Sequence, residues 1–476
     1  MNFSQGLQFL YPELILTFFA FGTLLAGVFT RGKNILGIMT FLGILLSAYC
    51  LPASFGSAPQ LFSNMLANDS FSAFFRVLIL VIAGMITLLS IGYKGLDEED
   101  LGEYWFFLLS LTAAMMIAVS SNNLMMIYIA LEGVSLISYI MAGYLKRDIL
   151  SSEAGTKYFL FGALSTGVTL YGVSLVYGLF GTLDLSLIVE SLPAQVMAHQ
   201  PAVLLALALV IVGFCFKCSL VPFHMWTPDV YEGAPTPVAA LLSVGPKAVG
   251  FAFILRVFVQ NFQGAFLSWA LFAGAIAVFT MTIGNIFAVT QNNIKRLLAY
   301  STIAQAGYIF VGLAVATPAG VQSTLFYLFI YSIMNLGAFA VVIIVSNNLK
   351  SEAIEDYAGL YKRDPLSAVA LTVSLLSLGG IPPLAGFLAK LFILAAAVEA
   401  QLTTLAVIVV LNSVVALYYY VRVVKFMFLN EPKNTQPIST PLAIQLVLII
   451  TLIGNIVFGV YPHPILDWLS NLLQLM

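Results

Sequence analysis

Charge is the scarcest property of this 476-residue chain. Only 8% of its residues are Asp, Glu, Lys or Arg, whereas 61% are hydrophobic, and the mean hydropathy is +1.01. Soluble globular domains carry about 25% charged residues, so the composition excludes that class. The formal net charge of −2 is spread over many short loops and offers no basic face to a nucleic acid. We therefore expect the chain to lie in a lipid bilayer.

Cysteine is rare, and the common nucleotide-binding motifs are absent. Three cysteines are too few for a disulfide-stapled secreted scaffold. Cys215 and Cys218 form a C-x-x-C pattern inside an apolar run, without a second pair to complete a zinc or iron–sulfur site, so we interpret them as packing residues. Neither G-x-G-x-x-G nor G-x-x-x-x-G-K-[ST] occurs, and the apolar runs lack histidines spaced for haem. We expect no nucleotide, metal or redox cofactor in this chain.

Apolar runs long enough to cross a membrane fill most of the sequence. A spanning helix needs roughly 20 such residues, and we count about fourteen runs. The linkers between them are too short for a soluble domain, and the alternating segments of a β-barrel are absent. No Lys or Arg precedes the first run, so we do not expect a cleavable signal peptide. We predict an all-α polytopic membrane protein with a single transmembrane domain over residues 1–476.

Positive charges fall in alternate loops, and the loops between them contain no Lys or Arg. The positive-inside rule assigns the charged loops to the inner side of the membrane. An even number of spans, with both termini outside, follows from this alternation. The residues assigned to the inner side are Arg31, Lys33, Lys94, Lys146, Arg147, Lys295, Arg296, Lys350, Lys362, Arg363, Arg422, Lys425 and Lys433.

Proline interrupts two of the apolar runs close to a lysine. Pro222 follows Lys217, and Pro382 and Pro383 precede Lys390. Proline removes a backbone donor and frees carbonyls inside a helix, and transporters place ion sites at such breaks in corresponding positions of two inverted repeats. A proline kink without a transport role is the alternative. An odd number of spans separates the two breaks, as an inverted repeat requires, and we predict repeats over residues 104–260 and 265–430, with flanking helices at 1–93 and 440–476.

Five ionisable residues lie within or near apolar runs. Each costs about 2.5–3.5 kcal/mol on insertion scales, which makes a function the default hypothesis. A structural Glu–Lys pair would gain about 4 kcal/mol at 4 Å and an effective dielectric constant of 20, but it would need only one lysine. Four lysines with one carboxylate favour a proton relay instead. The five residues are Glu132, Lys157, Lys217, Lys247 and Lys390.

Three basic residues near the ends of runs have a simpler interpretation. Lys157 lies near the inner end of its run and could extend its ammonium group to the membrane surface, so a role outside the relay remains open for it. Arg76 and Arg256 lie near outer ends. We interpret both arginines as surface anchors of this kind.

A histidine accompanies the first proline break. His224 follows Pro222 by two residues and could pass protons between Lys217 and Lys247, because imidazole titrates near neutral pH. A packing role beside Trp226 is the alternative, since a lone histidine next to a tryptophan is often a core residue.

Long motifs in the sequence resemble one known family. The run Phe216-Lys-Cys-Ser-Leu-Val-Pro-Phe-His-Met-Trp-Thr-Pro-Asp-Val-Tyr-Glu-Gly-Ala-Pro-Thr-Pro-Val238 is similar to the antiporter-like, proton-translocating membrane subunits of respiratory complex I. Further matches are Leu297-Leu-Ala-Tyr-Ser-Thr-Ile-Ala-Gln-Ala-Gly-Tyr308, Glu355-Asp-Tyr-Ala-Gly-Leu360 and Ser377-Leu-Gly-Gly-Ile-Pro-Pro-Leu-Ala-Gly-Phe-Leu-Ala-Lys390. The resemblance covers nearly the whole chain.

The resemblance implies a role for each buried ionisable residue. Glu132 matches a fifth-helix glutamate that pairs with the lysine of the broken seventh helix, Lys217. Lys157 matches a sixth-helix lysine that modulates or joins the relay. Lys247 matches the central eighth-helix lysine, and Lys390 matches a twelfth-helix position taken as the exit toward the outside.

The resemblance also implies an activity and partners. The activity is proton translocation coupled to quinone reduction elsewhere in an NADH:quinone oxidoreductase of the bacterial inner membrane. The neighbours would be an antiporter-like subunit M and a small subunit K, with FMN, iron–sulfur clusters and quinone held by other subunits. Two alternatives remain open. A subunit of a multisubunit cation/proton antiporter predicts sodium-dependent exchange, and a scaffold for neighbouring subunits predicts that the buried charges tolerate neutralisation.

Overall fold

The computed structural model describes residues 7–30, 32–54, 60–96, 100–262, 269–432 and 438–474, so Arg31 and Lys433 lie outside the described residues. Most of the described residues are helical, and the strands β1 (Gln60–Leu61) and β2 (Leu66–Ala67) form one short antiparallel pair. The helices are α2 (Tyr11–Phe29), α3 (Lys33–Ser54), α4 (Ser70–Gly92), α5 (Leu101–Val119), α6 (Leu124–Ala142), α7 (Ile149–Phe180), α8 (Leu185–Cys218), α9 (Trp226–Gly233), α10 (Thr236–Ile254), η2 (Leu255–Phe262), α11 (Trp269–Val289), α12 (Ile294–Val315), α13 (Pro318–Leu349), η4 (Ile354–Tyr357), α14 (Leu360–Arg363), α15 (Pro365–Gly379), α16 (Ala385–Glu399), α17 (Thr403–Leu429), α18 (Leu442–Val460) and α19 (His463–Gln474).

The helices account for the expected number of spans. Within the described residues, thirteen helical segments are long and apolar enough to cross a membrane. Helices α15 and α16 have 15 residues each, follow one another across the Pro382–Pro383 interruption, and together make a further span. The interruption at Pro222, which comes first in the chain, separates α8 from the eight-residue α9. The prediction of about fourteen helical spans with two proline-broken helices is confirmed, whereas the boundaries of the two repeats stay a prediction.

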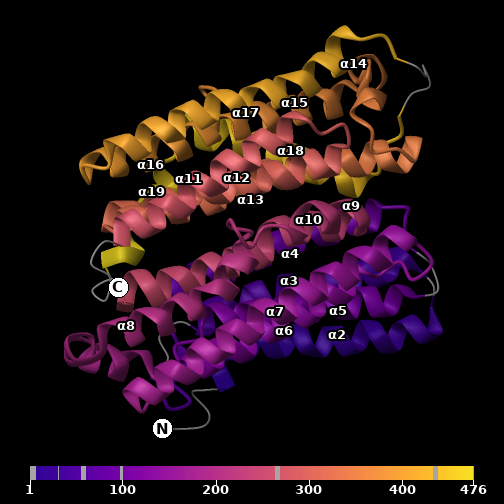
Figure 1. Cartoon of the computed structure of the whole chain (residues 1–476). Coiled ribbons are helices and arrows are strands. Elements are labelled where there is room, and N and C mark those ends of the chain that lie inside the picture. The colour runs from indigo at the N-terminus through magenta and orange to yellow at the C-terminus, as the bar shows by residue number, and fades with distance from the viewer. Residues whose placement is uncertain are drawn as a thin grey trace.

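The helices lie side by side in one bundle. In Figure 1, α2 to α10 form one group and α11 to α19 the other, and contacts of α10 with α13, α9 with α12, and α4 with α18 join the two groups. Helices α10, α12 and α13 are almost entirely buried. Buried side chains from the two groups of helices therefore meet at the centre of the bundle.

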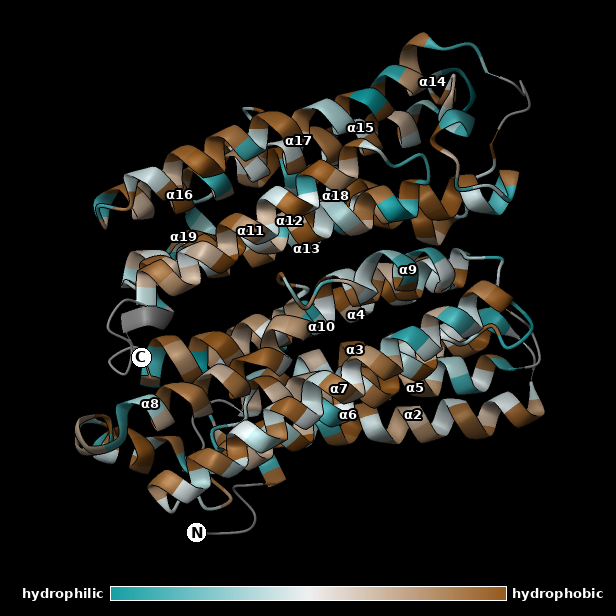
Figure 2. Cartoon of the chain, viewed as in Figure 1, coloured by the Kyte–Doolittle hydropathy of each residue, from teal (hydrophilic) through white to brown (hydrophobic). Residues whose placement is uncertain are grey.

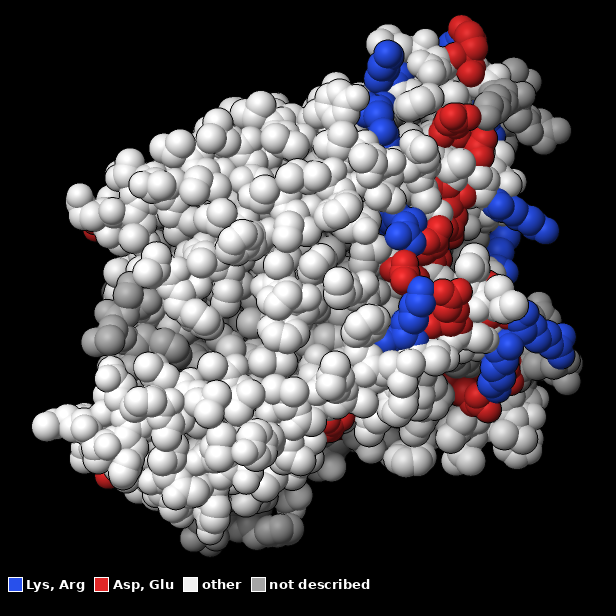
Figure 3. All heavy atoms as spheres, in the orientation of Figure 1, with Lys and Arg blue, Asp and Glu red and all other residues white. Residues whose placement is uncertain are grey.

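The outer surface has the polarity of a membrane protein. Hydrophobic residues dominate the outward faces of the helices in Figure 2, and large apolar side chains such as Phe18, Tyr171 and Val414 are well exposed. Charged side chains gather at one end of the face that Figure 3 presents, near α9 and α14. The apolar band matches a lipid environment, and the charged end matches one membrane surface.

Local capping explains where several helices begin. The side chains of Asn123, Asp148, Asp184 and Asn293 accept hydrogen bonds from backbone amides in the first turns of α6, α7, α8 and α12. Asp69 forms a reciprocal capping box with the third residue of α4. These caps satisfy amides that have no partner within the helix and fix the end of each span.

The interpretation of Arg76 and Arg256 as surface anchors is wrong, because both side chains are buried in ion pairs. Arg76 lies 2.7 Å from Glu13 of α2, and Arg256 binds Asp69 through two hydrogen bonds of 2.8 and 3.0 Å. Their exposed fractions are 0% and 4%. Each carboxylate comes from a distant part of the sequence, so neither pair could be read from the arginine's own neighbours.

Candidate functional site

Lys217 lies at the end of the first broken helix and contacts a neutral partner. It is fully buried on the last turn of α8, and its Nζ donates to Ser135 Oγ on α6 at 3.1 Å. Glu132 lies one turn earlier on α6 and is partly exposed. No ion pair joins Lys217 to Glu132 among the described residues. A hydroxyl group therefore stands where the resemblance implied a direct pair.

Lys247 binds the backbone where α8 unwinds. Its Nζ donates to the carbonyl of Cys218 at 3.2 Å and also contacts Ser219 Oγ. In a continuous helix the carbonyl of Cys218 would accept from the amide four residues later, and that residue is Pro222, which has no N–H group. The lysine takes the place of the missing amide. Ser219 adopts φ 60° and accepts a further hydrogen bond from Thr227 at 2.7 Å.

Lys390 also binds a backbone carbonyl that a proline leaves free, at the second broken helix. Its Nζ donates to the carbonyl of Gly379 at 3.0 Å, and the helical partner of that carbonyl would have been the amide of residue 383, a proline. The neighbouring carbonyl of Leu378 would have bonded to residue 382, also a proline, and instead accepts from Gln305 Nε2 at 3.0 Å. The prolines thus free the carbonyls to which Lys247, Lys390 and Gln305 donate hydrogen bonds.

A stacked aromatic pair lies between the first two lysines. The rings of Tyr158 on α7 and Trp226 on α9 lie 4.2 Å apart and are nearly parallel. Lys217 Nζ lies 5.6 Å from the Tyr158 ring, and Lys247 Nζ lies 5.5 Å from the Trp226 ring. Both distances are within the range of a cation–π attraction. The pair therefore links the two ammonium groups without supplying a counter-charge.

His224 lies in the turn after the break but does not bridge the lysines. It is partly buried, and its Nδ1 has no hydrogen-bond partner among the described residues. Among the described residues His224 forms no hydrogen bond with Lys217 or Lys247, each of which has the partners described above. A shuttle role for His224 stays a hypothesis.

Neutral polar side chains fill the space between Lys247 and Lys390. Gln305 of α12 accepts from Tyr327 at 2.6 Å and donates to Tyr420 at 3.3 Å, and Tyr331 donates to Thr302 at 3.0 Å. All five side chains are buried. Sequence reasoning that followed charge missed them, although the polar positions along α12 and α13 recur at the spacing of one helix turn.

A second cluster of buried polar side chains lies next to Lys390. Its Nζ is 4.5 Å from the ring of Tyr308, whose hydroxyl accepts from Asn285 at 2.9 Å. Asn285 in turn accepts from Tyr419 at 3.0 Å and donates to Asn412. The lysine is again surrounded by dipoles and a π-system.

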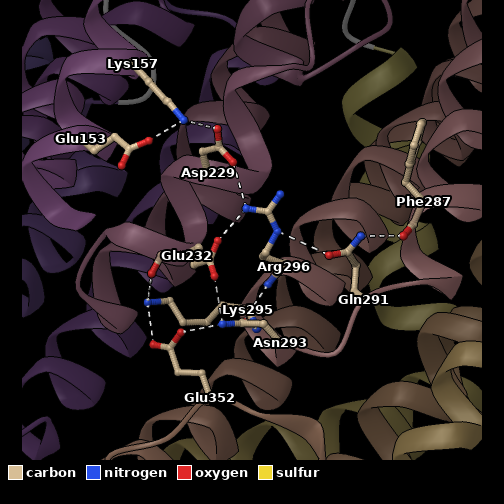
Figure 4. Close-up of polar contacts among 10 residues, drawn as sticks. All are labelled: Glu153, Lys157, Asp229, Glu232, Phe287, Gln291, Asn293, Lys295, Arg296 and Glu352. Atoms are coloured by element: carbon tan, nitrogen blue, oxygen red, sulfur yellow. Dashed lines mark hydrogen bonds and ion pairs between the residues drawn. The ribbon is translucent and has the colours of Figure 1, made fainter. Parts of the chain in front are cut away.

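Lys157 lies apart from this row, in a cluster of ion pairs at the charged end of the bundle (Figure 4). Its ammonium group is 2.6 Å from both Glu153 and Asp229, and 38% of its side chain is exposed. Arg296 joins Asp229 at 2.9 Å to Glu232 at 2.6 Å. This arrangement matches the alternative left open for Lys157, a side chain that reaches the membrane surface.

The cluster explains the acidic residues of the Pro228-Asp-Val-Tyr-Glu232 motif. Asp229 and Glu232 on α9 bind α7 and α12, which belong to different halves of the bundle (Figure 4). Helix α9 is not one of the membrane spans. Burial alone would raise the pKa of the Asp229 carboxyl, but the hydrogen bonds and charges of Lys157 and Arg296 outweigh it and hold that pKa below its ordinary value. Asp229 is therefore ionised, and its ion pairs with Lys157 and Arg296 join the two halves of the bundle.

Comparison with known proteins identifies the family. A family model described as NADH:quinone oxidoreductase/Mrp antiporter, transmembrane, matches residues 121–416. The chain belongs to this family. The matched part contains Glu132, the lysines of both broken helices and the ion-pair cluster.

Relatives and solved structures extend the family likeness to nearly the whole chain. NADH-quinone oxidoreductase subunit N of Trichlorobacter lovleyi is 39% identical over 99% of this chain and 98% of the relative. NAD(P)H-quinone oxidoreductase subunit 2 of Rippkaea orientalis is 42% identical over 95% and 91%. A chain of respiratory complex I from Thermus thermophilus superposes with a TM-score of 0.80 at 31% identity, covering 96% of this chain and 98% of that one.

Two further structures share the fold. A chain of the membrane-bound sulfane sulfur reductase, an archaeal respiratory membrane complex, has a TM-score of 0.89 at 25% identity, over 98% of this chain and 97% of that one. A chain of the Mrp complex from Dietzia sp. has a TM-score of 0.85 at 22% identity, over 97% of both chains. The antiporter-like fold is therefore common to respiratory and antiporter complexes.

Proposed function

We propose that the chain is the subunit N type of membrane subunit in a proton-translocating NADH:quinone oxidoreductase. The observation that carries this proposal is the environment of Lys217, Lys247 and Lys390. Each is buried, and none forms an ion pair among the described residues. An ammonium group held by carbonyls, hydroxyls and aromatic rings can release its proton without breaking a salt bridge. Such a group is suited to a relay rather than to structural pairing.

The relay follows the order of the contacts. Glu132 lies at the partly exposed surface of α6, where a neighbouring subunit can change its charge. Ser135 connects this helix to Lys217, and the aromatic pair connects Lys217 to Lys247. Moving one charge against 100 mV costs about 2.3 kcal/mol. At an effective dielectric constant of 20, a unit charge about 4 Å away alters the energy of an ammonium group by about 4 kcal/mol. The effect of Glu132 on Lys217 is smaller, because the two side chains do not lie within ion-pair distance.

The proposal includes partners and orientation. The neighbours are an antiporter-like subunit M and a small subunit K, and the FMN, iron–sulfur clusters and quinone belong to other subunits. The charged end of the bundle faces the cytoplasm of a bacterium, and both termini face the periplasm. The charge asymmetry of the loops supports this orientation.

Native separation tests the assignment to a complex. Membranes that contain the affinity-tagged chain are solubilised in a mild detergent, separated, and stained for NADH oxidation coupled to a dye. We expect the chain to migrate with a large NADH-oxidising particle. Migration in a particle without this activity, together with sodium-dependent proton exchange in vesicles, would assign the chain to a cation/proton antiporter instead.

Neutralising the lysines tests the relay. We expect Lys217→Ala and Lys247→Ala to lower proton pumping and coupled quinone reduction by roughly tenfold or more, because each removes a proton-carrying group. The measurements are fluorescence quenching in inverted vesicles and the rate of NADH oxidation. Lys362→Ala is the matched control, since Lys362 is an exposed lysine paired with Glu431. Full activity in all three assembled variants would favour the scaffold alternative.

A further inference from the structure

Helix α13 carries a line of polar side chains that extends beyond the lysine row. Ser323, Tyr327, Tyr331 and Asn335 follow one another at intervals of four residues, and all four are buried. Residues four apart lie on one face of a helix, so these side chains form a polar stripe along α13. Polar groups inside a membrane bundle cost free energy. A stripe of four therefore indicates a function.

The inner part of the polar stripe touches the surroundings of both broken-helix sites. Asn335 donates to Ser243, which lies one turn before the lysine of α10. Tyr327 donates to Gln305 at 2.6 Å, and Gln305 binds the freed carbonyl beside the carbonyl that holds the α16 lysine. The stripe thus begins where a proton would reside after crossing the lysine row.

The other end of the polar stripe opens into a cavity of about 390 Å³ beneath α19. Ser323 lines this cavity together with Glu399 at the end of α16 and His463 and Asp467 on α19. These three titratable side chains are exposed. Gln322 donates to two oxygens of α19, at 2.8 and 3.3 Å, and so holds α19 over the cavity. We call this the α19 cavity.

The α19 cavity lies at the end of the bundle opposite to the ion-pair cluster. In Figure 1, α16 and α19 lie at one end, whereas α9 and α14 lie at the other. Helix α13 runs between the two ends: Ser323 is in its second turn, and its last residue, Leu349, precedes Lys350. The polar stripe therefore leads from the centre of the bundle away from the charged end.

We propose that the polar stripe of α13 and the α19 cavity form the outlet through which protons leave the buried lysine row, with Glu399, His463 and Asp467 as acceptors at its mouth. This inference rests on the proposed function. It places the outlet along α13, and it adds residues of α13, α16 and α19 that the sequence analysis did not single out.

The chemistry of each step is a simple proton transfer. A lysine ammonium group gives up one proton and becomes neutral, and each hydroxyl of the stripe accepts a proton on its oxygen while releasing its own hydrogen to the next group. One helix turn rises 5.4 Å, more than a hydrogen bond, and one water molecule is enough to join two hydroxyls over that distance. A carboxylate or imidazole at the mouth takes the proton and passes it to bulk water.

Closing the mouth chemically tests the outlet. In the complete complex, with Cys50 replaced by serine, a cysteine is placed at Ala319, an exposed residue that lines the α19 cavity. Vesicles with the α19 end outward are treated with a membrane-impermeant methanethiosulfonate reagent, the reagent is removed, and the membranes are inverted. NADH-driven proton pumping is then compared between inverted vesicles from treated and untreated membranes. The matched control is Ala198→Cys, an exposed residue that follows the far end of α7, precedes the bend of α8 at His199, and does not line this cavity.

The outcomes separate the outlet from the proposed function. We expect modification of Ala319→Cys to lower the pumping rate by roughly fivefold or more, as loss of a positioned proton acceptor does, while modified Ala198→Cys pumps normally. Unchanged pumping in modified Ala319→Cys would overturn the outlet, and so would an equal loss in both variants. The proposed function has its own test in the same vesicles, because it requires Lys247→Ala to lower pumping by roughly tenfold or more whether or not Ala319→Cys is sensitive to modification.

Discussion

At the scale of single residues, the buried lysines depend on neutral partners that are specific to each of them. Ser219 is the clearest case, because its left-handed backbone places its hydroxyl against Lys247. Lys217 depends on Ser135 in the same way, and Lys390 depends on the carbonyl of Gly379. Changing such a partner should alter the proposed proton relay without removing any charge from the membrane interior.

The variant Ser219→Gly tests this dependence. Glycine adopts φ 60° freely, so the backbone is preserved. A hydrogen bond to a charged group contributes about 1.5–3 kcal/mol, and its loss should lower the proton-pumping rate by roughly tenfold. Ala316→Gly is the matched control, because Ala316 has φ 50° and no polar side chain. Equal pumping rates in the two variants would show that the Ser219 hydroxyl has no part in the relay.

Asp229 gives a prediction about pH. Because its pKa in the folded protein lies below the ordinary value of 3.8, its ion pairs stabilise the fold fully above that value. The stabilisation is lost as the pH falls through the lowered pKa. Asp229→Asn should therefore lower the melting temperature near neutral pH, by an amount equivalent to about 0.5 kcal/mol for this partly exposed pair.

The difference between wild-type protein and Asp229→Asn should shrink as the pH falls from 5 toward 2 in tryptophan-fluorescence melts, since both proteins then lack the ionised carboxylate. Glu431→Gln serves as a control, because Glu431 pairs with Lys362 while 84% exposed. A constant difference between wild-type protein and Asp229→Asn at every pH would mean that the pairs with Lys157 and Arg296 do not stabilise the fold.

At the scale of elements, each broken helix is a binding site made by proline. Pro222, Pro382 and Pro383 lack the amides that would have closed the helix, and lysine or glutamine side chains from other positions use the free carbonyls. The C-terminal end of a helix is also the negative end of its dipole, which favours a nearby cation. The geometry of the unwound turn therefore decides whether the lysine can form its hydrogen bond to the free carbonyl.

Gly380 tests the second unwound turn. It has φ +88°, and an added Cβ would lie 3.0 Å from Cδ of Lys390. Gly181 also has a positive φ, of +70°, but an added Cβ there meets nothing within 4 Å. Both glycine-to-alanine variants should lose about 1–2 kcal/mol of unfolding free energy through left-handed strain, measured by thermal or denaturant unfolding.

Only Gly380→Ala should also lower proton pumping, because the new methyl group displaces the Lys390 side chain from the carbonyl of Gly379. Pumping in inverted vesicles, normalised to the amount of assembled complex, checks this difference. If Gly181→Ala pumped as poorly as Gly380→Ala, the loss would come from reduced stability rather than from the position of the lysine.

The sequence predicts the elements and the charges better than the contacts. A lysine such as Lys217 is conspicuous in an apolar run, and Pro222, five residues later, predicts the helix break. Ser135 and Gln305 are neutral, and similar residues occur in many membrane helices, so nothing in the local pattern singles them out. Their partners lie 73 to 82 residues away in the chain. The ion pairs of Arg76 and Arg256 are equally hard to predict, since helix packing alone brings their carboxylates to them.

At the scale of the whole molecule, the distribution of charge predicts the orientation in the membrane. Ser152, at the start of α7, lies near the ion-pair cluster, and Ala198 lies beyond the far end of α7, before the bend of α8 at His199. Both residues are exposed. An impermeant thiol reagent should label Ser152→Cys in inverted vesicles and Ala198→Cys in right-side-out vesicles, with Cys50 replaced by serine. The opposite pattern of labelling would place the charged end in the periplasm.

Helix α9 has only eight residues and is about 12 Å long. One end carries Trp226, against which the central lysine rests, and the other carries Glu232, which is bound at the membrane surface. Two turns of helix thus connect the surroundings of a buried lysine to the ion pairs at the charged end of the bundle. Salt or anionic lipids that weaken these ion pairs should shift Trp226 as well, so we expect the proton-pumping rate to depend on the lipid composition of the membrane.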